Sequence, residues 1–302
     1  MATLVERNAD SAAPLGSAFK LYVLAAVPDE ITAGGLSWEE TLELTSMNRS
    51  LPSGMLQAKP DGTKITVLQA ARQMIGISDN TATDLLIARV GRERVERAVA
   101  NLGHSDPAAM TPFLTTREIF QLSYGAGEGS AASRELQKLS LAWAGAAVDE
   151  RRGILQRVDE LPLALSEQGF VDRVGEPQEP PWTRGLEWFA TPADIAAAHR
   201  GLAERAERQP ELTQIFLSNP GLGASPGLDR TVWPSIAYKG GGNLGVLTGA
   251  WRAERSDGSA VNVVLMLSGD TSETAREIQF ASGELSGLSQ AILELLGEKP
   301  TG

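Results

Sequence analysis

Cysteine is absent from the 302-residue chain, histidine occurs twice, and aromatic residues make up 5% of it. Without cysteine the protein has no disulfide, no thiol nucleophile and no cysteine-based metal site. His104 and His199 are too few for a histidine-rich metal site, and they lack the H-E-x-x-H spacing of zinc hydrolases. No G-x-S-x-G motif is present either. We therefore expect both histidines to be surface or core residues, and we expect no metal and no other cofactor.

The chain also lacks long apolar runs, internal repeats and low-complexity tracts, so no membrane segment is expected in it. No basic segment followed by an apolar stretch precedes residue 17, so no signal peptide is visible and localisation cannot be read from the start of the chain. The net charge of −11 argues against nucleic acid and anionic membrane surfaces as partners. A hydrophobic content of 42% suffices for a sizeable core. The composition agrees with a soluble enzyme, and the acidity says little about its substrate.

A serine and a lysine three residues apart, Ser17 and Lys20, stand at the head of an apolar run that predicts a helix over residues 17–27. On a helix this spacing places the hydroxyl and the amine on one face. The unpaired N–H groups and the dipole of the first turn favour a developing negative charge there. The pair therefore predicts a serine nucleophile activated by an amine. The alternative is a solvated lysine beside a helix-capping serine.

Two further motifs follow in the chain: Ser78-Asp79-Asn80, between two helix-like segments, and Lys239-Gly240-Gly241-Gly242, before a strand-like run. Three motifs in this order resemble the S-x-x-K, S-D-N and K-x-G set of class A β-lactamases and penicillin-binding proteins. The resemblance extends from about residue 3 to about residue 296 and is weakest over 115–187. Two stretches, 51–54 and 187–192, resemble an actinobacterial subgroup related to the β-lactamase-like protein of clavulanic acid gene clusters.

The resemblance implies a role for each motif residue. Ser17 would attack a carbonyl and become acylated, Lys20 would accept or position its proton, and Ser78 would pass a proton to the leaving group. Lys239 would lower the pKa of Lys20 and attract a substrate carboxylate. Substrate contacts are expected from Asn80, Gly241, Gly242 and Arg252, and the backbone N–H groups of Ser17 and Gly242 would form the oxyanion hole. For Asp79 we expect loop-fixing hydrogen bonds rather than contact with substrate.

The sequence departs from the family pattern in two places. Gly240 stands where the family usually has a hydroxyl residue, so one hydrogen bond to a substrate carboxylate is expected to be missing. The family's deacylating glutamate lies in an E-x-x-L-N segment, which is absent here. If Thr191-Pro192 opens the helix after that loop, Glu176 is the first candidate for this base, with Glu179 and Glu187 as alternatives. Without such a base the acyl-enzyme would persist.

Helix-like segments between strand-like ends predict an α+β fold: an antiparallel sheet flanked by helices, plus an all-α lobe. We expect one β-lactamase-like domain over 1–302, with an α/β lobe from about 1–36 and 225–302 and an α lobe from about 37–224. The hairpin over 245–268 turns at Asp257-Gly258, and a long helix is expected over 273–296. Only one strand, residues 3–6, fits before Ser17, so the N-terminus looks shortened.

The predicted function is a serine hydrolase that opens β-lactams or cleaves related esters or amides through an acyl-enzyme. The alternatives are a D-amino-acid peptidase of the penicillin-binding type, and a protein that binds β-lactams with slow turnover. The expected partner is thus a small-molecule β-lactam, ester or peptide, and not a nucleic acid.

Overall fold

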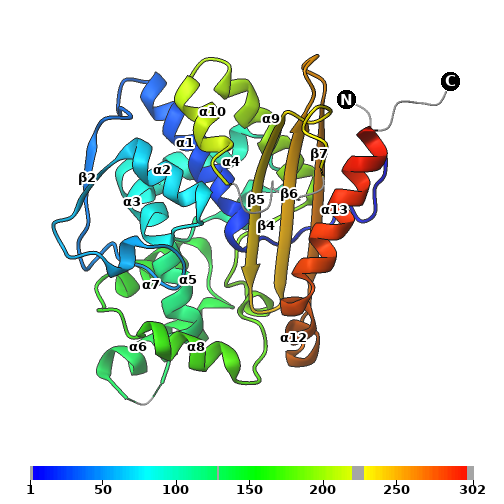
Figure 1. The fold of residues 1–302 in the computed structure, drawn as a ribbon. Helices are drawn as coiled ribbons and strands as arrows, with labels where there is room; N and C mark the ends of the chain where they lie inside the picture. The colour runs from blue at the N-terminus through cyan, green and yellow to red at the C-terminus, as the bar shows by residue number, and fades with distance from the viewer. Residues whose placement is uncertain (1–2, 128, 220–227, 298–302) are drawn as a thin grey trace.

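The computed structural model describes residues 3–127, 129–219 and 228–297 (Figure 1). A three-stranded antiparallel sheet stands beside a group of helices, with the strand order β5 (Ser235–Asn243), β6 (Val246–Glu254) and β7 (Ala260–Ser268). Helices α12 (Ser272–Phe280) and α13 (Ser282–Gly297) pack on one face of the sheet. Helix α9 (Pro192–Ala206) and the short turn η1 (Gly16–Phe19) pack on the other face. The predicted α+β architecture is confirmed.

Helix α1 (Lys20–Thr32) links this sheet layer to the other helices. These are α2 (Val67–Gly76), α3 (Asn80–Val90), α4 (Arg92–Asn101), α5 (Thr116–Tyr124), α6 (Ala131–Trp143), α7 (Val148–Asp159), α8 (Glu167–Gly175) and α10 (Pro210–Phe216). Short 3-10 turns are η2 (Leu56–Ala58), η3 (Pro107–Met110) and η4 (Pro181–Arg184). Two small antiparallel pairs join β1 (Ala13–Pro14) to β4 (Phe189–Ala190) and β2 (Thr41–Glu43) to β3 (Lys64–Thr66). Within the described ranges, none of the helices has the length and apolarity needed to cross a bilayer.

The sheet register places the third motif on an edge strand. β5 pairs with β6 alone among the described strands, and Lys239 stands opposite Ala250. β6 and β7 form the predicted hairpin, whose turn contains Gly258 with a φ of +82°, a conformation that glycine adopts without strain. The other edge of β5 lies against η1.

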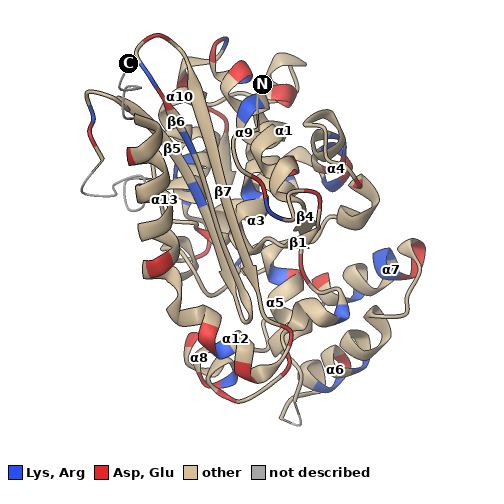
Figure 2. Cartoon of the chain, turned by 90° about the vertical axis from the view of Figure 1, so that its right-hand side faces the viewer, with Lys and Arg blue, Asp and Glu red and all other residues tan. Residues whose placement is uncertain are grey.

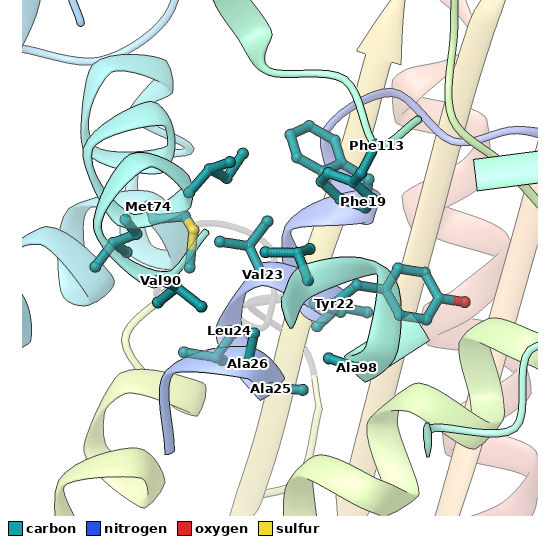
Figure 3. Packing of buried hydrophobic residues seen from close by; sticks show 14 of the residues in the cluster. Phe19, Tyr22, Val23, Leu24, Ala25, Ala26, Met74, Val90, Ala98 and Phe113 are labelled. Atoms are coloured by element: carbon teal, nitrogen blue, oxygen red, sulfur yellow. The ribbon is translucent and has the colours of Figure 1, made fainter. Parts of the chain in front are cut away.

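Helix α1 is buried along most of its length and forms the centre of the larger core (Figure 3). Tyr22 and Val23 are fully buried and belong to one cluster with Met74 of α2, Val90 of α3 and Ala98 of α4. Its composition explains this burial, because an almost wholly apolar helix can be covered on every side. Burying such side chains is worth roughly 1.5–3 kcal/mol each, and it fixes the helix that follows Ser17. A second, smaller cluster lies between the sheet and α13.

Three expectations from the sequence are corrected. Residues 3–6 are not a strand, so the described sheet is built from C-terminal segments alone. The capping-box pattern Ser37-Trp38-Glu39-Glu40 predicts the start of a short helix, but no helix begins there; instead, the carbonyls of Trp38 and Glu40 accept the N–H groups of Leu68 and Val67 at the start of α2. The C-terminal helix is divided at Ala281 into α12 and α13.

Charged residues lie mainly on the outer helices (Figure 2). Both signs are visible on α6, α7 and α12, whereas the strands of the sheet are largely uncharged. This is the usual distribution for a water-exposed surface around apolar layers. Lys20 and Lys239 depart from this distribution, because both are buried.

Candidate active site

The predicted nucleophile lies in a tight turn at the start of α1. Gly16 has a φ of +50°, and a Cβ built on it would lie 2.6 Å from the backbone nitrogen of Gly242. The Leu15 N–H donates to the Trp188 carbonyl at 2.9 Å, which fixes the approach to the turn. Ser17 is half-buried, while the residues after it in the turn are buried. The hydroxyl is thus the part of the turn that a ligand can reach.

Lys20 is fully buried and its amine lies at the centre of the site. Its Nζ donates to the Ser78 carbonyl and to Asn80 Oδ1, both at 2.6 Å, and lies within hydrogen-bonding distance of Ser17 Oγ at 3.1 Å and Ser78 Oγ at 3.0 Å. Burial, and after it the charge of Lys239, holds the pKa of Lys20 well below its ordinary value of 10.5. A lysine in this environment can act as a base near neutral pH.

Ser78 lies between two amines. Lys239 Nζ donates to Ser78 Oγ at 3.1 Å and to the Gly240 carbonyl at 2.7 Å. Burial lowers the pKa of Lys239 from 10.5 to about 7. Ser78 itself has a φ of +58°, which is uncommon for a residue with a side chain and costs of order 1–3 kcal/mol. The turn thus holds a hydroxyl where it can exchange protons with Lys20 and Lys239.

Asp79 holds this turn in place, as the sequence predicted. Its Oδ1 accepts the Ala82 N–H at 2.8 Å and caps α3, while its Oδ2 accepts the N–H groups of Met55 and Leu56 at 2.7 and 3.0 Å. Asp79 is completely buried, and these three donors satisfy its carboxylate. Its carboxylate therefore binds backbone N–H groups and not the side chains around Lys20.

The glycine run lets β5 approach the nucleophile turn closely. A Cβ at Gly241 would overlap the Leu15 carbonyl and would lie 2.8 Å from the backbone nitrogen of Ser17. Gly242 is exposed, and its own nitrogen lies against Gly16. The backbone N–H groups of Ser17 and Gly242 therefore belong to two segments in direct contact.

The structure explains why position 240 is a glycine, for a reason that the sequence did not suggest. A Cβ at this position would overlap Tyr238 Oη, because the Tyr238 ring leans along the strand over Gly240. Tyr238 also packs on Trp251 of β6 with ring centroids 5.0 Å apart, and Gly240 stands opposite Gly249. Aromatic rings covering a cross-strand glycine pair is a known way to support such positions. A phenol thus occupies the space of a side chain at position 240.

The structure separates the three glutamate candidates. Glu176 and Glu179 are exposed near the end of α8. Glu187 is only 3% exposed and lies before β4, where it accepts the Trp188 N–H at 3.1 Å and Asn243 Nδ2 at 3.0 Å. Burial raises its pKa from 4.5 to about 7. Only Glu187 of the three is therefore packed against the segments that carry the site.

Arg252 lies two residue pairs along the sheet from Lys239, opposite Ala237. Its guanidinium is 3.4 Å from Glu254, and its charge is one cause of the lowered pKa of His199 on α9, after burial. Its hydrogen bond goes to Glu254, and within the described residues none joins it to Ser17, Lys20, Ser78, Asn80 or Lys239.

Two further features were missed from the sequence. Asn243, at the end of β5, and Tyr124, in α5, are hydrogen-bonded to each other at 2.8 Å beside Glu187. Asp84 of α3 accepts the backbone N–H groups of Thr116 and Arg117, both at 2.8 Å, and so fixes the start of α5. Asn243 directly follows the glycine motif, which was the one available signal. Across the described part of the chain, no three His, Asp or Glu side chains are grouped to hold a metal ion.

Parts of the chain are similar in sequence to known β-lactamases. Residues 2–148 match the model of the Beta-lactamase enzyme family. A segment of 100 residues is 31% identical to Beta-lactamase VEB-1 of Pseudomonas aeruginosa; it covers 32% of this chain and 33%, about a third, of that relative's length.

Solved structures match over almost the whole chain. A β-lactamase from Sphaerobacter thermophilus is 22% identical, with a TM-score of 0.56, covering 94% of this chain and 86% of that one. The chromosome-encoded β-lactamase of Vibrio parahaemolyticus is 17% identical, with a TM-score of 0.59 and coverage of 97% and 88%. PBP-A is 16% identical, with a TM-score of 0.57 and coverage of 95% and 83%. At these identities the structural matches show a shared fold.

Proposed function

We propose that the protein is a serine hydrolase that opens β-lactams through an acyl-enzyme on Ser17. Residues 2–148 are similar in sequence to β-lactamases, and nearly the whole chain shares the fold of solved β-lactamases. The observation that carries the proposal is the 3.1 Å contact between the reachable hydroxyl of Ser17 and the buried amine of Lys20. Related esters and amides present the same kind of carbonyl and are included in the proposed substrate class.

The acylation step uses the side chains that surround the Lys20 amine. Ser17 Oγ attacks the lactam carbonyl carbon, and its proton passes to the unprotonated form of Lys20 Nζ, which burial and the charge of Lys239 favour. The backbone N–H groups of Ser17 and Gly242 would bind the resulting oxyanion; losing one such donor typically costs about a hundredfold to a thousandfold in rate. The carbon–nitrogen bond then breaks, and the leaving nitrogen takes the proton of Ser78 Oγ. Ser78 regains a proton from Lys20 through their 3.0 Å contact.

We assign substrate binding to residues next to the same serine and lysine side chains. Lys239, when protonated, would attract a substrate carboxylate, and Asn80, which holds Lys20, would meet a substrate amide. Gly241 and Gly242 would offer the backbone of the β5 edge. The pairing of Arg252 with Glu254 gives no support to a role for it in substrate binding.

We further propose that deacylation is slow. The exposed Glu176 remains a candidate for the base that activates water, and the buried Glu187 is bonded to Asn243 and Trp188. Acylation uses a preformed array, so it would outrun hydrolysis. A structural relative, a PBP-A mutant, is known as an acyl-enzyme complex with penicillin G.

The related proposals of a penicillin-binding peptidase and of a slowly turning-over β-lactam-binding protein share the same acylation step. The actinobacterial subgroup suggested by residues 51–54 and 187–192 stands as a further proposal of the same kind.

Hydrolysis of a chromogenic cephalosporin by the wild type and by Ser17→Ala tests the function. We expect measurable hydrolysis with an initial burst in the wild type and none in Ser17→Ala. A folded Ser17→Ala protein that keeps full activity would exclude the serine mechanism. Glu176→Gln, Glu179→Gln and Glu187→Gln are then compared by intact mass; accumulation of an acyl-enzyme in one of them identifies the base.

A further inference from the structure

Glu187 is a buried carboxylate that faces hydrogen-bond donors from three parts of the chain. Its Oε1 accepts the Trp188 N–H at 3.1 Å, and its Oε2 accepts Asn243 Nδ2 at 3.0 Å. The backbone N–H of Gly16 is the third donor. These donors come from the segment before β4, from the end of β5 and from the turn before α1. One side chain therefore ties three separate parts of the chain together.

The side-chain amide of Asn243 can be oriented in only one way. Its Oδ1 accepts the hydroxyl of Tyr124 at 2.8 Å and the N–H of Leu244 at 2.9 Å. Both partners are donors, so the amide oxygen must face them and the NH2 group must face Glu187. Tyr124 is itself held, because its ring packs edge-on against Phe170 at 5.2 Å. Asn243 is thus a fixed donor and Glu187 its fixed acceptor.

The residues that Glu187 holds stand next to the two proposed oxyanion donors. Gly16 directly precedes Ser17, and Asn243 directly follows Gly242. We propose that Glu187 is a positioning residue that sets the spacing between the Ser17 and Gly242 N–H groups by binding Gly16 and Asn243 at once. This inference rests on the proposed serine mechanism, which makes those two N–H groups the oxyanion donors.

The charge of Glu187 determines how firmly it holds these residues. Hydrogen bonds to an ionised acceptor are roughly twice as strong as neutral ones. With a pKa of about 7, raised by burial, Glu187 loses its charge as the pH falls through neutrality. The other titratable groups of this network are Tyr124, whose pKa is raised by burial and by Glu187, and Arg184 of η4, which acts on Tyr124 in the opposite direction. The hydrogen bonds to Glu187 are therefore strongest above pH 7.

Glu187→Gln keeps the shape of the side chain and removes its charge. The substituted amide would still accept at its oxygen, but its NH2 group would face the NH2 group of Asn243. Combining this change with Asn243→Asp reverses the polarity of that contact: the amide at position 187 donates to the new carboxylate, whose other oxygen still accepts from Tyr124 and Leu244. Glu204→Gln, the same change at an exposed position of α9, is the control.

The experiment measures acylation by a chromogenic cephalosporin and a fluorescent penicillin between pH 5.5 and 8.5. At pH 8 we expect Glu187→Gln to acylate between about tenfold and a hundredfold more slowly, with little change in KM, because misplaced donors mainly affect the transition state. The wild-type-to-variant ratio should fall toward one below pH 6, with a midpoint near 7. Glu187→Gln/Asn243→Asp should recover most of the lost rate at pH 8, and Glu204→Gln should match the wild type.

A rate ratio that is unity or independent of pH, or a double variant no better than Glu187→Gln, would overturn the positioning role while leaving Ser17-dependent acylation intact. A wild type that neither reagent acylates would instead overturn the serine mechanism, and the positioning role with it. The two failures are therefore distinguishable in one set of measurements.

Discussion

The burial of Glu187 makes a quantitative prediction about stability that needs no substrate. Glu187→Gln replaces a buried carboxylate that lies between the nucleophile turn and the end of β5. In the folded protein the pKa of Glu187 is about 7, against an ordinary value of 4.5. The folded state therefore binds more protons than the unfolded state between these two pH values. Stability then falls as the pH rises through this window.

The size of the effect follows from the same two values. Each pKa unit corresponds to about 1.36 kcal/mol, so the interval from 4.5 to about 7 corresponds to roughly 3 kcal/mol at most. The glutamine of the variant cannot ionise and lacks this slope. The difference in the free energy of unfolding, wild type minus Glu187→Gln, should therefore drop by roughly 3 kcal/mol between pH 4.5 and pH 8. Any pH-independent cost of facing two NH2 groups cancels in this comparison.

The assay is urea unfolding of both proteins at half-unit pH steps, monitored by tryptophan fluorescence. Asp84, whose pKa burial raises from 3.8 to about 7, and His199, whose pKa burial lowers to about 3, also give slopes, of opposite sign, but these are common to both proteins. A difference that stays constant across the pH range would show that Glu187 titrates normally, and the account of its burial would be refuted.

Two further predictions concern β5. Gly240→Ser, which the sequence alone suggests as an improvement for carboxylate-bearing β-lactams, should destabilise the protein by about 1–3 kcal/mol because its Cβ overlaps the Tyr238 ring; in Tyr238→Val this penalty should disappear, and additive losses in a double-mutant cycle would contradict the overlap. Lys239→Ala should lower kcat/KM for a cephalosporin roughly tenfold or more, since a charge-assisted hydrogen bond contributes about 1.5–3 kcal/mol; an equal loss for a neutral nitrophenyl ester would show that Lys239 does not act on the carboxylate.

Short-range patterns made much of the site predictable. The spacing of Ser17 and Lys20 is a property of a single helical turn, and Ser78, Asn80 and Lys239 stand in short motifs whose order could be read along the chain. The structure brings these five residues together around two amines. The α+β fold was predictable for a related reason, because the hairpin turn and the apolar helix have local signals.

The remainder depends on contacts between residues far apart in the chain. Glu187 and Asn243 are 56 positions apart, and Tyr124 and Asn243 are 119 apart, so no local pattern connects them. The overlap of Tyr238 with position 240 requires knowing how far the ring leans along the strand. Arg252 shares a sheet with Lys239, but its guanidinium pairs with Glu254 of its own strand. Burial, finally, separates Glu187 from the exposed Glu176 and Glu179.

The most direct test of the central claim is peptide mapping of the protein after brief exposure to penicillin G. The account predicts that the intact mass increases by one penicillin and that the modification lies on Ser17. It also predicts that Ser17→Ala and Lys20→Ala remain unmodified under the same conditions. An unmodified wild type, or an adduct on any other residue, would contradict the proposed nucleophile.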